Sequence, residues 1–396
     1  MRVAWVCEYP ASSFSERPSL RNAPSSHPVP WIVVQAPLVV AAGVELHVIT
    51  VSKHIAADDE FERDGIHFHF LKIPGIPRAA LGYQFDRGRI SACLTRITPD
   101  LVQGFGTESS FGYSAVSSRF PSVLMIQGIV ARITEARGKS ALWRQPQLCI
   151  ALLFERLTVK RARHVICETG FAADFVHSYN PRAITHIVRT PIQDSWFDIA
   201  PSADTTAAPE VLFVGWVVPA KGVDVLIAAF ADVLKTCPRA VLHVVGSYEP
   251  AYLQDVLMPA VARFGVTDRV HFHGGQSASF IADRLARAAV VVLPTRMDTA
   301  PNVLAEARAA GVPVVASAVG GIPELIEDDV DGLLVEAGAI APLAAAVVRV
   351  LTDAPLAARL SRHGRERVRR DHRLSEQVPK LLEIYRGILA ESGARA

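Results

Sequence analysis

The chain has 396 residues, of which 50% are hydrophobic and 20% are charged, and its formal net charge is +2. This length is too great for one ordinary hydrophobic core and favours two domains of roughly 150 to 200 residues each. The composition excludes a disordered protein, and the small net charge gives no general attraction to nucleic acid, so no nucleic-acid partner is expected.

The cysteines and the N-terminus indicate a reducing compartment. The five cysteines are odd in number, lie far apart and form no Cys-x-x-Cys pair, so neither a disulfide framework nor a zinc ribbon is expected. The first apolar residues are too few for a signal-peptide core. The longest apolar run, 31–44, is shorter than the ~18 residues that a membrane span needs. We expect a cytoplasmic protein, with a peripheral contact to the inner membrane face left open.

The first half of the chain alternates short apolar strands with helical patterns. Helical spacing is clearest at 147–161, where Leu148, Leu152, Glu155 and Val159 recur on one face. This alternation favours an α/β fold with a mostly parallel, doubly wound sheet, so residues 1–197 are predicted to form a Rossmann-like domain. The strands are predicted at 2–7, 44–50, 66–72, 100–104, 122–127, 164–168 and 184–189.

A change in composition marks the predicted domain boundary. Residues 198–209 are rich in Ala, Ser, Thr and Pro without periodicity, which is typical of a linker. A second alternating series follows, so residues 210–373 are predicted to form a second Rossmann-like domain that faces the first across a cleft. The amphipathic segment 374–396 lies outside this series and is expected to pack back on the first domain. The later strands are predicted at 211–214, 241–245, 270–273, 290–293, 312–316 and 333–335.

The strongest functional signal runs from residue 293 to residue 335. A strand is followed by a loop with Asp298, a helix with Glu306, another strand, and the turn Gly320-Gly321 before a second helix. This order places two carboxylates and two helix N-termini at the carboxyl ends of neighbouring strands. An open α/β sheet binds phosphorylated ligands at that edge.

The loop between this strand and its helix supplies candidate binding atoms. A helix is predicted at 302–310, with Gly311 just past its end. The free amides before it suit phosphate or sugar hydroxyls, and the carboxylates of Asp298 and Glu306 can accept hydrogen bonds from adjacent hydroxyls of a ribose or hexose. The candidate donor-binding residues in the loop are Thr299, Ala300, Pro301, Asn302 and Val303.

A second signal lies at the start of the second domain. A strand ends at Gly215, a loop passes Lys221, and Gly222 opens a helix. Lys221 can neutralise a diphosphate leaving group, and the adjoining helix start adds partial positive charge. Gly246 and Gly274, which follow the next two strands, are further nucleotide-binding candidates.

Two pairs of alternating histidines raise the question of a metal site. His271 and His273 point to the same face of a strand, but no third ligand accompanies them in the sequence. His67 and His69 form a similar pair and are interpreted as ordinary strand residues. No metal and no cofactor are therefore expected.

These motifs resemble the signature of GT-B glycosyltransferases of family 4, the glycosyl transferases group 1, which are retaining, metal-independent enzymes. The matching residues are Asp298, seven residues and then Glu306, followed by Gly-Val-Pro-Val-Val and Gly-Gly-Ile-Pro-Glu. The resemblance implies that Glu306 binds the nucleotide ribose and that Asp298 lies near the donor sugar. It also implies that Lys221 stabilises the departing diphosphate and that the turn at Gly274 forms a backbone wall for the nucleobase.

The chain departs from the family pattern at several positions. An arginine normally follows the glycine after the first strand of the second domain, but Trp216 stands there, so Arg296 or Arg132 is a conjectured substitute. The first acid of the signature is more often Glu than Asp. In the first half, Glu8 and its neighbours replace the family's glycine-rich loop.

Signals in the first half are weaker. The segment 125–128 resembles the strand whose His-Gly contacts the donor sugar in many relatives, but Gln127 replaces the histidine and retains only its hydrogen bonding. Glu108 and Arg132 lie near this strand end and are candidates for contact with acceptor or donor.

The sequence therefore predicts a retaining glycosyltransferase of the hexosyltransferase type, which moves a sugar from a nucleoside diphosphate sugar to an acceptor hydroxyl. The acceptor is left open as a glycan, a lipid-linked sugar or a small molecule, as in polysaccharide or glycolipid biosynthesis. Two alternatives also stay open: a nucleotide-sugar epimerase of the same fold, and a non-catalytic subunit that binds a nucleotide sugar.

Overall fold

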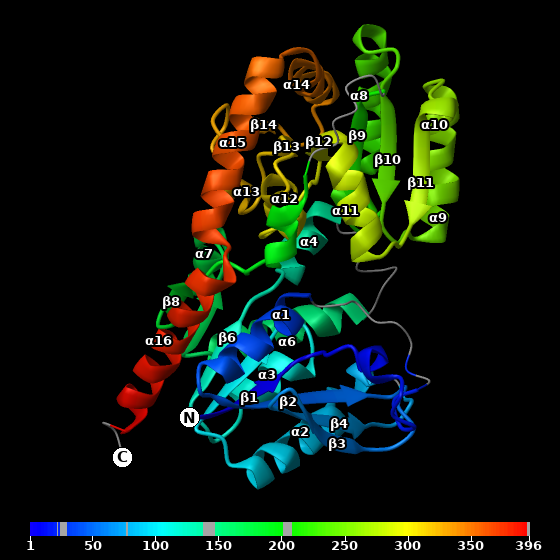
Figure 1. Ribbon diagram of the computed structural model, residues 1–396. Coiled ribbons are helices and arrows are strands. Elements are labelled where there is room, and N and C mark those ends of the chain that lie inside the picture. The colour runs from blue at the N-terminus through cyan, green and yellow to red at the C-terminus, as the bar shows by residue number, and fades with distance from the viewer. Residues whose placement is uncertain (22, 24–29, 77, 138–146, 201–207, 394–396) are drawn as a thin grey trace. The chain divides into compact units, whose positions relative to one another are not determined.

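The computed structural model describes residues 1–21, 23, 30–76, 78–137, 147–200 and 208–393 (Figure 1). Its contacts divide the chain into two compact units: residues 1–191 with the segment that begins at Leu374, and residues 192–373. The predicted boundary at residue 197 is wrong, because Trp196 and Phe197 are buried in the core of the second unit. Most of the predicted linker, 198–209, falls on residues 201–207, which lie outside the described residues.

The first unit is built on an eight-stranded sheet with the order β3-β4-β2-β1-β5-β6-β7-β8. All neighbouring strands run parallel, except for the antiparallel pair β3–β4. Every strand predicted in this half is confirmed. The strands are β1 (Arg2–Val6), β2 (Glu45–Ser52), β3 (Asp59–Arg63), β4 (Ile66–Lys72), β5 (Leu101–Phe105), β6 (Ser122–Met125), β7 (His164–Cys167) and β8 (Ile184–Ile187).

Strand β3 is the one element of this sheet that the sequence pattern misses. Four of its five residues, Asp-Glu-Phe-Glu-Arg, are charged, so no apolar run marks it. The strand forms because Asp64 and Gly65 take positive φ values of 53° and 74°, which suit a tight hairpin turn onto β4. Charged residues are tolerated there because β3 is an edge strand.

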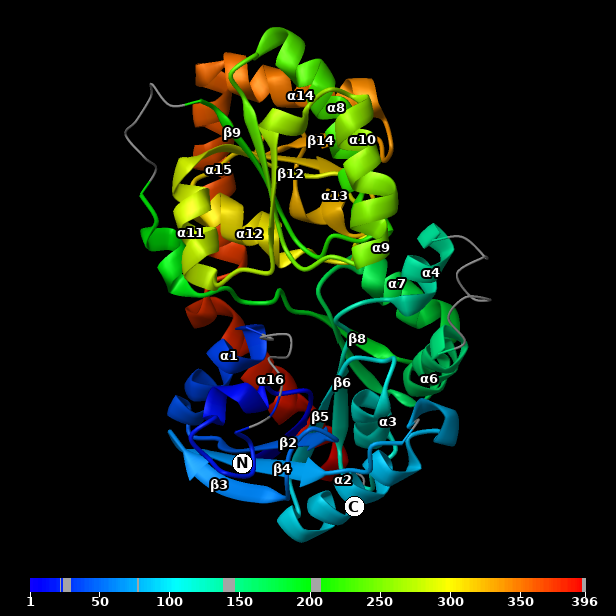
Figure 2. The same ribbon diagram turned by 90° about the vertical axis from the view of Figure 1, so that its right-hand side faces the viewer.

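Helices cover both faces of the first sheet, and the C-terminal helix α16 lies beside α1 (Figures 1 and 2). Tyr385 of α16 is fully buried, and its hydroxyl accepts a 2.9 Å hydrogen bond from Trp5 Nε1 of β1 and donates to Gln103 Oε1 of β5. Chain ends that are far apart in sequence thus share one core. The helices are α1 (Pro30–Ala41), α2 (Gln84–Ile97), α3 (Ser110–Val116), α4 (Val130–Arg137), α6 (Gln147–Arg161), α7 (Gly170–Tyr179) and α16 (Leu374–Gly393).

The second unit is built on a six-stranded, wholly parallel sheet with the order β11-β10-β9-β12-β13-β14. Counted along this unit, the order is 3-2-1-4-5-6, which is the doubly wound Rossmann arrangement. The predicted strands are again confirmed. They are β9 (Glu210–Val214), β10 (Val241–Val245), β11 (Val270–Gly274), β12 (Ala288–Leu293), β13 (Val314–Ser317) and β14 (Leu333–Val335).

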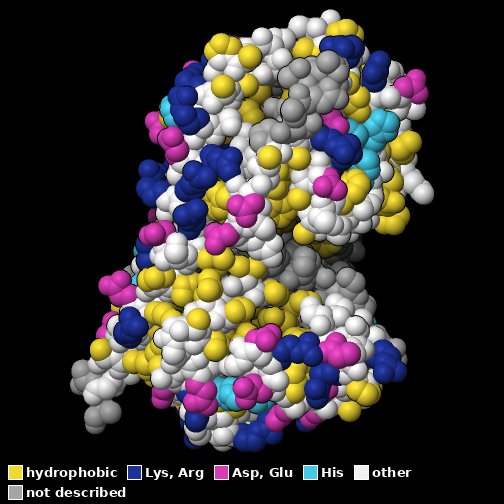
Figure 3. All heavy atoms as spheres, viewed as in Figure 1, with side chains coloured by type: hydrophobic (Ala, Val, Ile, Leu, Met, Phe, Trp, Pro, Cys, Tyr) yellow, Lys and Arg dark blue, Asp and Glu magenta, His cyan; other side chains and the backbone are white. Residues whose placement is uncertain are grey.

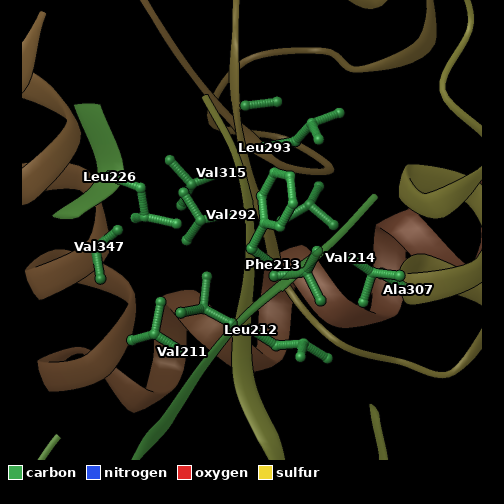
Figure 4. Packing of buried hydrophobic residues seen from close by; sticks show 14 of the residues in the cluster. Val211, Leu212, Phe213, Val214, Leu226, Val292, Leu293, Ala307, Val315 and Val347 are labelled. Carbon is green, nitrogen blue, oxygen red and sulfur yellow. The ribbon is translucent and has the colours of Figure 1, made fainter. Parts of the chain in front are cut away.

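The core of the second unit lies between this sheet and its helices. Residues on both faces of β9 are buried, as expected for a central parallel strand, and Phe213 packs among side chains of β12, β13 and the helices (Figure 4). The helices are α8 (Val223–Thr236), α9 (Pro250–Tyr252), α10 (Met258–Arg263), α11 (Ala278–Arg287), α12 (Asn302–Ala309), α13 (Ile322–Leu325), α14 (Ile340–Thr352) and α15 (Ala354–Asp371).

Within the described part of the chain, no helix taken singly has both the length and the apolar composition for a membrane span. One bent pair, Ile340–Thr352 with Ala354–Gly393, passes that test only when its two arms are taken together.

Candidate active site

The second sheet has its topological switch point between β9 and β12. These strands are neighbours, but the chain proceeds from β9 toward β10 on one side and from β12 toward β13 on the other. Loops that leave the carboxyl ends of such strands diverge and leave room for a ligand. Most of the predicted donor-site residues lie in the loops after β9, β12 and β13.

Two glycines bring these loops into backbone contact. A Cβ on Gly222 would lie 2.0 Å from the carbonyl oxygen of Pro294, and one on Gly320 would lie 1.8 Å from that of Asp298. Both glycines also have positive φ, 70° and 58°. Only glycine fits such positions, so the loops after β9 and β13 can close on the loop after β12.

Turns at the ends of β9, β10 and β11 form a similar backbone ladder. Gly246 donates its amide hydrogen to Gly274 O over 2.8 Å, and a Cβ on Gly246 would lie 1.8 Å from Gly215 O. The three predicted glycines are therefore adjacent in space. The half-exposed ring of Tyr248 lies next to Gly274.

Lys221 and Asp298 meet at the switch point. Lys221 follows β9, Asp298 follows β12, and the ammonium group donates to Asp298 Oδ2. The other oxygen of this carboxylate accepts the amide hydrogen of Thr299 at 3.0 Å, and the backbone carbonyl of Asp298 accepts that of Gly321 at 3.1 Å. The side chain of Lys221 is 25% exposed and that of Asp298 is 14% exposed, so a ligand can reach the pair.

Helix α12 begins without a side-chain cap. Its N-cap residue is Pro301, and the amide of Leu304 already donates to the Pro301 carbonyl at 3.1 Å. Among the described residues, the amides of Ala300, Asn302 and Val303 have no acceptor, and all three residues are partly exposed. The first turn of α12 can therefore bind an anion or accept sugar oxygens.

Glu306 lies one turn into α12. Burial raises the pKa of its carboxyl to about 7. Within the part of the chain that the structure describes, this carboxylate makes no hydrogen bond or ion pair, and no contact joins it to Lys221 or Asp298. A partly buried carboxylate that lacks donors is suited to the hydroxyls of a ligand.

Arg296 does not occupy the place of the family's missing arginine. Its guanidinium donates to both oxygens of Asp224, at 2.9 and 2.6 Å, and to Pro219 O at 2.5 Å. Burial alone would raise the pKa of Asp224, but hydrogen bonds from Arg296 and Tyr252 bring it below its ordinary value. The conjecture that Arg296 supplies a free second cation is therefore wrong. Trp216, which stands at the family's arginine position, is 63% exposed.

In the first unit, two of the three predicted acceptor-side residues line one pocket. Glu108 follows β5 and Gln127 follows β6, and the pocket of about 210 Å³ lies at the carboxyl ends of these strands. Gln127 Nε2 is buried without a partner, which leaves a donor for a ligand oxygen. The other lining residues are Glu8, Ile32, Arg78, Tyr83, Phe105, Ser109, Ser110 and Phe111.

Arg132 is not among the residues that line this pocket. It lies on α4 and forms a 2.9 Å ion pair with Glu135 of the same helix. A role for it in substrate contact stays a prediction.

A second cavity of about 210 Å³ shares Glu8, Arg78 and Phe111 with this pocket. It adds the cationic side chain of Lys53 and the imidazole of His54. The sequence analysis names neither residue, and Arg78 carries no motif that could have marked it.

Glu155 is a buried acid that the sequence analysis assigns only to a helix face. It accepts hydrogen bonds from the amides of Val130 at 2.7 Å and Ala131 at 2.9 Å, so it caps α4 from the neighbouring helix α6. Burial raises its pKa to about 7. The signal was present in the sequence, because an acid recurs there at core spacing with Leu152 and Val159.

Sequence comparison finds related proteins for part of the chain. Residues 208–353 match the family of glycosyl transferases group 1. A D-inositol 3-phosphate glycosyltransferase from Segniliparus rotundus is 38% identical over 130 residues, which are 33% of this chain and 29% of that protein. A GDP-mannose-dependent alpha-(1-6)-phosphatidylinositol monomannoside mannosyltransferase from Mycobacterium tuberculosis is 33% identical over 186 residues, 45% of this chain and 48% of that protein. The chain thus spans less than half of either relative's length.

Structural comparison covers the whole chain at low identity. Sucrose-phosphate synthase from Thermosynechococcus elongatus has a TM-score of 0.81 at 20% identity, covering 99% of this chain and 100% of that one. WaaG, a glycosyltransferase involved in lipopolysaccharide biosynthesis, has a TM-score of 0.69 at 19% identity, covering 97% and 99%. The predicted fold, the two Rossmann-like domains of GT-B glycosyltransferases, is thereby confirmed.

Proposed function

Residues 208–353 belong to the glycosyl transferases group 1, and from this premise we propose that the chain is a glycosyltransferase. It would move a sugar from a nucleoside diphosphate sugar to an acceptor hydroxyl with retention of anomeric configuration. The observation that carries the proposal is the meeting of Lys221 and Asp298 beside the uncapped start of α12. One cation, several free amides and a carboxylate then face a single activated sugar.

The proposed chemistry depends on positioning and on leaving-group stabilisation. The ammonium of Lys221 and the amides of Asn302 and Val303 would bind the diphosphate and stabilise the charge that develops as it departs. Asp298 would both hold Lys221 in place and accept hydrogen bonds from the donor sugar. We propose that the reaction needs no metal and no covalent nucleophile.

The acceptor class is proposed from the cavities of the first unit. Lys53, Arg78 and His54 give one of them cationic lining, which suits an anionic acceptor. Two relatives are named for an inositol phosphate and a phosphatidylinositol mannoside, which are polyol or lipid phosphates. We therefore favour a phosphorylated polyol or glycolipid as acceptor, and an acceptor panel with and without phosphate would test this directly.

Donor affinity is expected to rise with pH through about 7. The pKa of Glu306 is raised to about 7 by burial, and only its ionised form can accept hydrogen bonds from both ribose hydroxyls. Between pH 6 and pH 8 the ionised fraction rises roughly ten-fold, so the dissociation constant for the donor should fall by up to about that factor. Calorimetry across this range measures the slope, and proton release should accompany binding.

The matched variants for this pH dependence are Glu306→Gln and Glu366→Gln, which removes an exposed carboxylate on α15. Glu306→Gln should flatten the pH profile, whereas Glu366→Gln should leave it unchanged. Linkage adds a second readout: because folding raises the pKa, the ligand-free protein should lose stability between pH 4.5 and about 7, and Glu306→Gln should remove that loss. A profile of the same slope in both variants would exclude Glu306 from the donor site.

A non-catalytic, nucleotide-sugar-binding subunit is the second candidate. It is favoured by one observation: Trp216 replaces the family's arginine, while Arg296 is held by Asp224. Donor binding in calorimetry, without hydrolysis or transfer to any acceptor of the panel, would support this candidate.

Replacement of Trp216 by arginine should separate the two candidates. Trp216 is exposed at the end of β9, so a guanidinium there can reach solvent and a bound diphosphate without displacing a core residue. If the chain is an enzyme short of one cation, Trp216→Arg should raise turnover and tighten nucleoside diphosphate binding about ten-fold. Tyr248→Phe, at a nearby half-exposed aromatic position, is the control. Unchanged turnover and affinity would show that position 216 does not face the diphosphate.

A further inference from the structure

Histidines gather at the amino end of the first sheet, on the face that α2 covers. His47 lies on β2 opposite His67 of β4, and His69 of β4 lies opposite Glu60 of the edge strand β3. The rings of His47 and His69 are nearly parallel, with 5.3 Å between centroids and 20° between planes. In the space-filling view, histidine, acidic and basic side chains occur together in the lower part of the molecule (Figure 3).

Four of these groups form a continuous line of contacts. Glu45 Oε1 lies 3.2 Å from His47 Nε2, and His47 Nδ1 lies 3.0 Å from His69 Nε2. At the other end, His69 Nδ1 lies 3.5 Å from Glu60 Oε1. The two imidazoles are only 9% and 8% exposed, so water does not complete their hydrogen bonding.

The line is short of one proton. Two neutral imidazoles carry two N–H groups, but the three contacts need three hydrogens. The shorter contacts favour donation from His47 Nε2 to Glu45 and from His69 Nε2 to His47 Nδ1. The lone pair of His69 Nδ1 then faces the Glu60 carboxylate, and this buried nitrogen has no hydrogen-bond partner. Burial lowers the pKa of both histidines, which disfavours filling the gap with an additional proton.

A third potential ligand completes the group. Cys93 of α2 is 3% exposed, and ligand atoms of Glu60, His69 and Cys93 all lie within 4.8 Å of one another. A cation is already drawn to this place, because Arg96 Nη2 donates to Glu60 and lies 3.8 Å from Cys93 Sγ. The side chain of Arg96 is 59% exposed, so it can move into solvent when another cation binds.

We propose that Glu60, His69 and Cys93 form a binding site for a borderline-soft divalent cation, Zn²⁺, with water in a fourth position. Carboxylate, imidazole and thiolate are the side-chain ligands that zinc takes, at about 2.0 to 2.3 Å in tetrahedral geometry. Those bond lengths place neighbouring ligand atoms about 3.3 to 3.8 Å apart. The 3.5 Å between His69 Nδ1 and Glu60 Oε1 already matches this spacing. Binding converts the thiol of Cys93 to a zinc thiolate, and its proton passes to solvent.

The neighbouring residues fit this assignment. His47 holds the distal nitrogen of His69 and so orients the ring, as the second shell of a metal site does. The ion would join β3, β4 and α2, one of them an edge strand without apolar residues to anchor it apart from Phe61. The site lies at the amino end of the sheet, and none of its residues lines the two cavities at the carboxyl end.

Titration with Co²⁺ tests the proposal, because a cobalt–thiolate bond adds a charge-transfer absorption band. The full chain is used with Cys149→Ser as background, since Cys149 is an exposed thiol. One equivalent of Co²⁺ should produce the band, Zn²⁺ should displace it, and the additional change Cys93→Ser should abolish it. His47→Gln should weaken affinity about 10- to 100-fold. His186→Gln, which alters the His164–His186 contact in the same sheet, should have no effect.

Arg96→Ala provides a test that does not risk the fold, because this side chain is mostly exposed. If Arg96 occupies the cation position in the metal-free protein, its removal should tighten Co²⁺ and Zn²⁺ binding several-fold. Circular dichroism verifies that each variant is folded. The proposal is overturned if the parent shows no thiolate band, if the band survives Cys93→Ser, or if Arg96→Ala leaves the affinity unchanged. None of these results depends on glycosyl transfer, so they leave the proposed enzymatic function untouched.

Discussion

Replacing Lys221 by alanine is expected to lower donor turnover at least ten-fold. Lys221 supplies the ammonium group at the switch point of the second sheet, where it is paired with Asp298. Removing one preorganised charge from a leaving-group site typically costs about 10² to 10³ in kcat. The effect should fall mainly on kcat rather than on KM, because the charge on the diphosphate grows as the bond to the sugar breaks. Release of nucleoside diphosphate from the donor measures it.

Lys235→Ala is the matched control for this experiment. Lys235 lies on α8, the helix that follows the Lys221 loop, and its side chain is 76% exposed in a pair with Asp232. Its removal should leave kcat within about two-fold, as expected for an exposed ion pair. Equal rates for Lys221→Ala and the parent would remove Lys221 from the reaction. Loss of binding without change in kcat would assign it to the ground state alone.

Replacing Tyr385 by alanine is expected to destabilise the first unit by about 3 to 5 kcal/mol, the usual cost of deleting a large buried aromatic side chain. Tyr385 is fully buried, and its hydroxyl joins Trp5 of β1 to Gln103 of β5. Tyr385→Phe keeps the ring but leaves both partners without their hydrogen bonds, and should cost about 1 to 3 kcal/mol. Urea unfolding monitored by tryptophan fluorescence measures both.

Arg386→Ala on the same helix is the control, since this neighbour of Tyr385 is exposed. It should change stability by less than about 0.5 kcal/mol. If Tyr385→Ala were no less stable than Arg386→Ala, helix α16 would not be part of the cooperative core of the first unit.

The order of the strands could be read from the sequence, because buried parallel strands are apolar along their whole length. All thirteen predicted strands are present, and only β3 was missed, since its exposed edge position permits charged residues. The domain boundary at residue 197 failed for a similar reason. Trp196 and Phe197 are apolar in either domain, and only their packing assigns them to the second core.

The donor-side residues were also identifiable in advance as candidates. Asp298, Glu306 and Lys221 follow strand ends, and in an open parallel sheet every strand end of this kind lies on one edge. What the spacing could not predict is which side chains pair. Lys221 contacts Asp298, Arg296 is held by Asp224, and Glu306 has no charged partner.

By itself, the sequence determined the two doubly wound sheets, the set of residues at the carboxyl edge of the second one, and the departures at Trp216 and Gln127. Periodicity and glycine turns are local properties, so they need no knowledge of distant residues. Only the tertiary structure decided which groups meet across strands: the Tyr385 bridge, the acid that caps α4, and the line from His47 to Cys93. Such contacts depend on register and burial, which join residues tens to hundreds of positions apart, and no local pattern encodes that partnership.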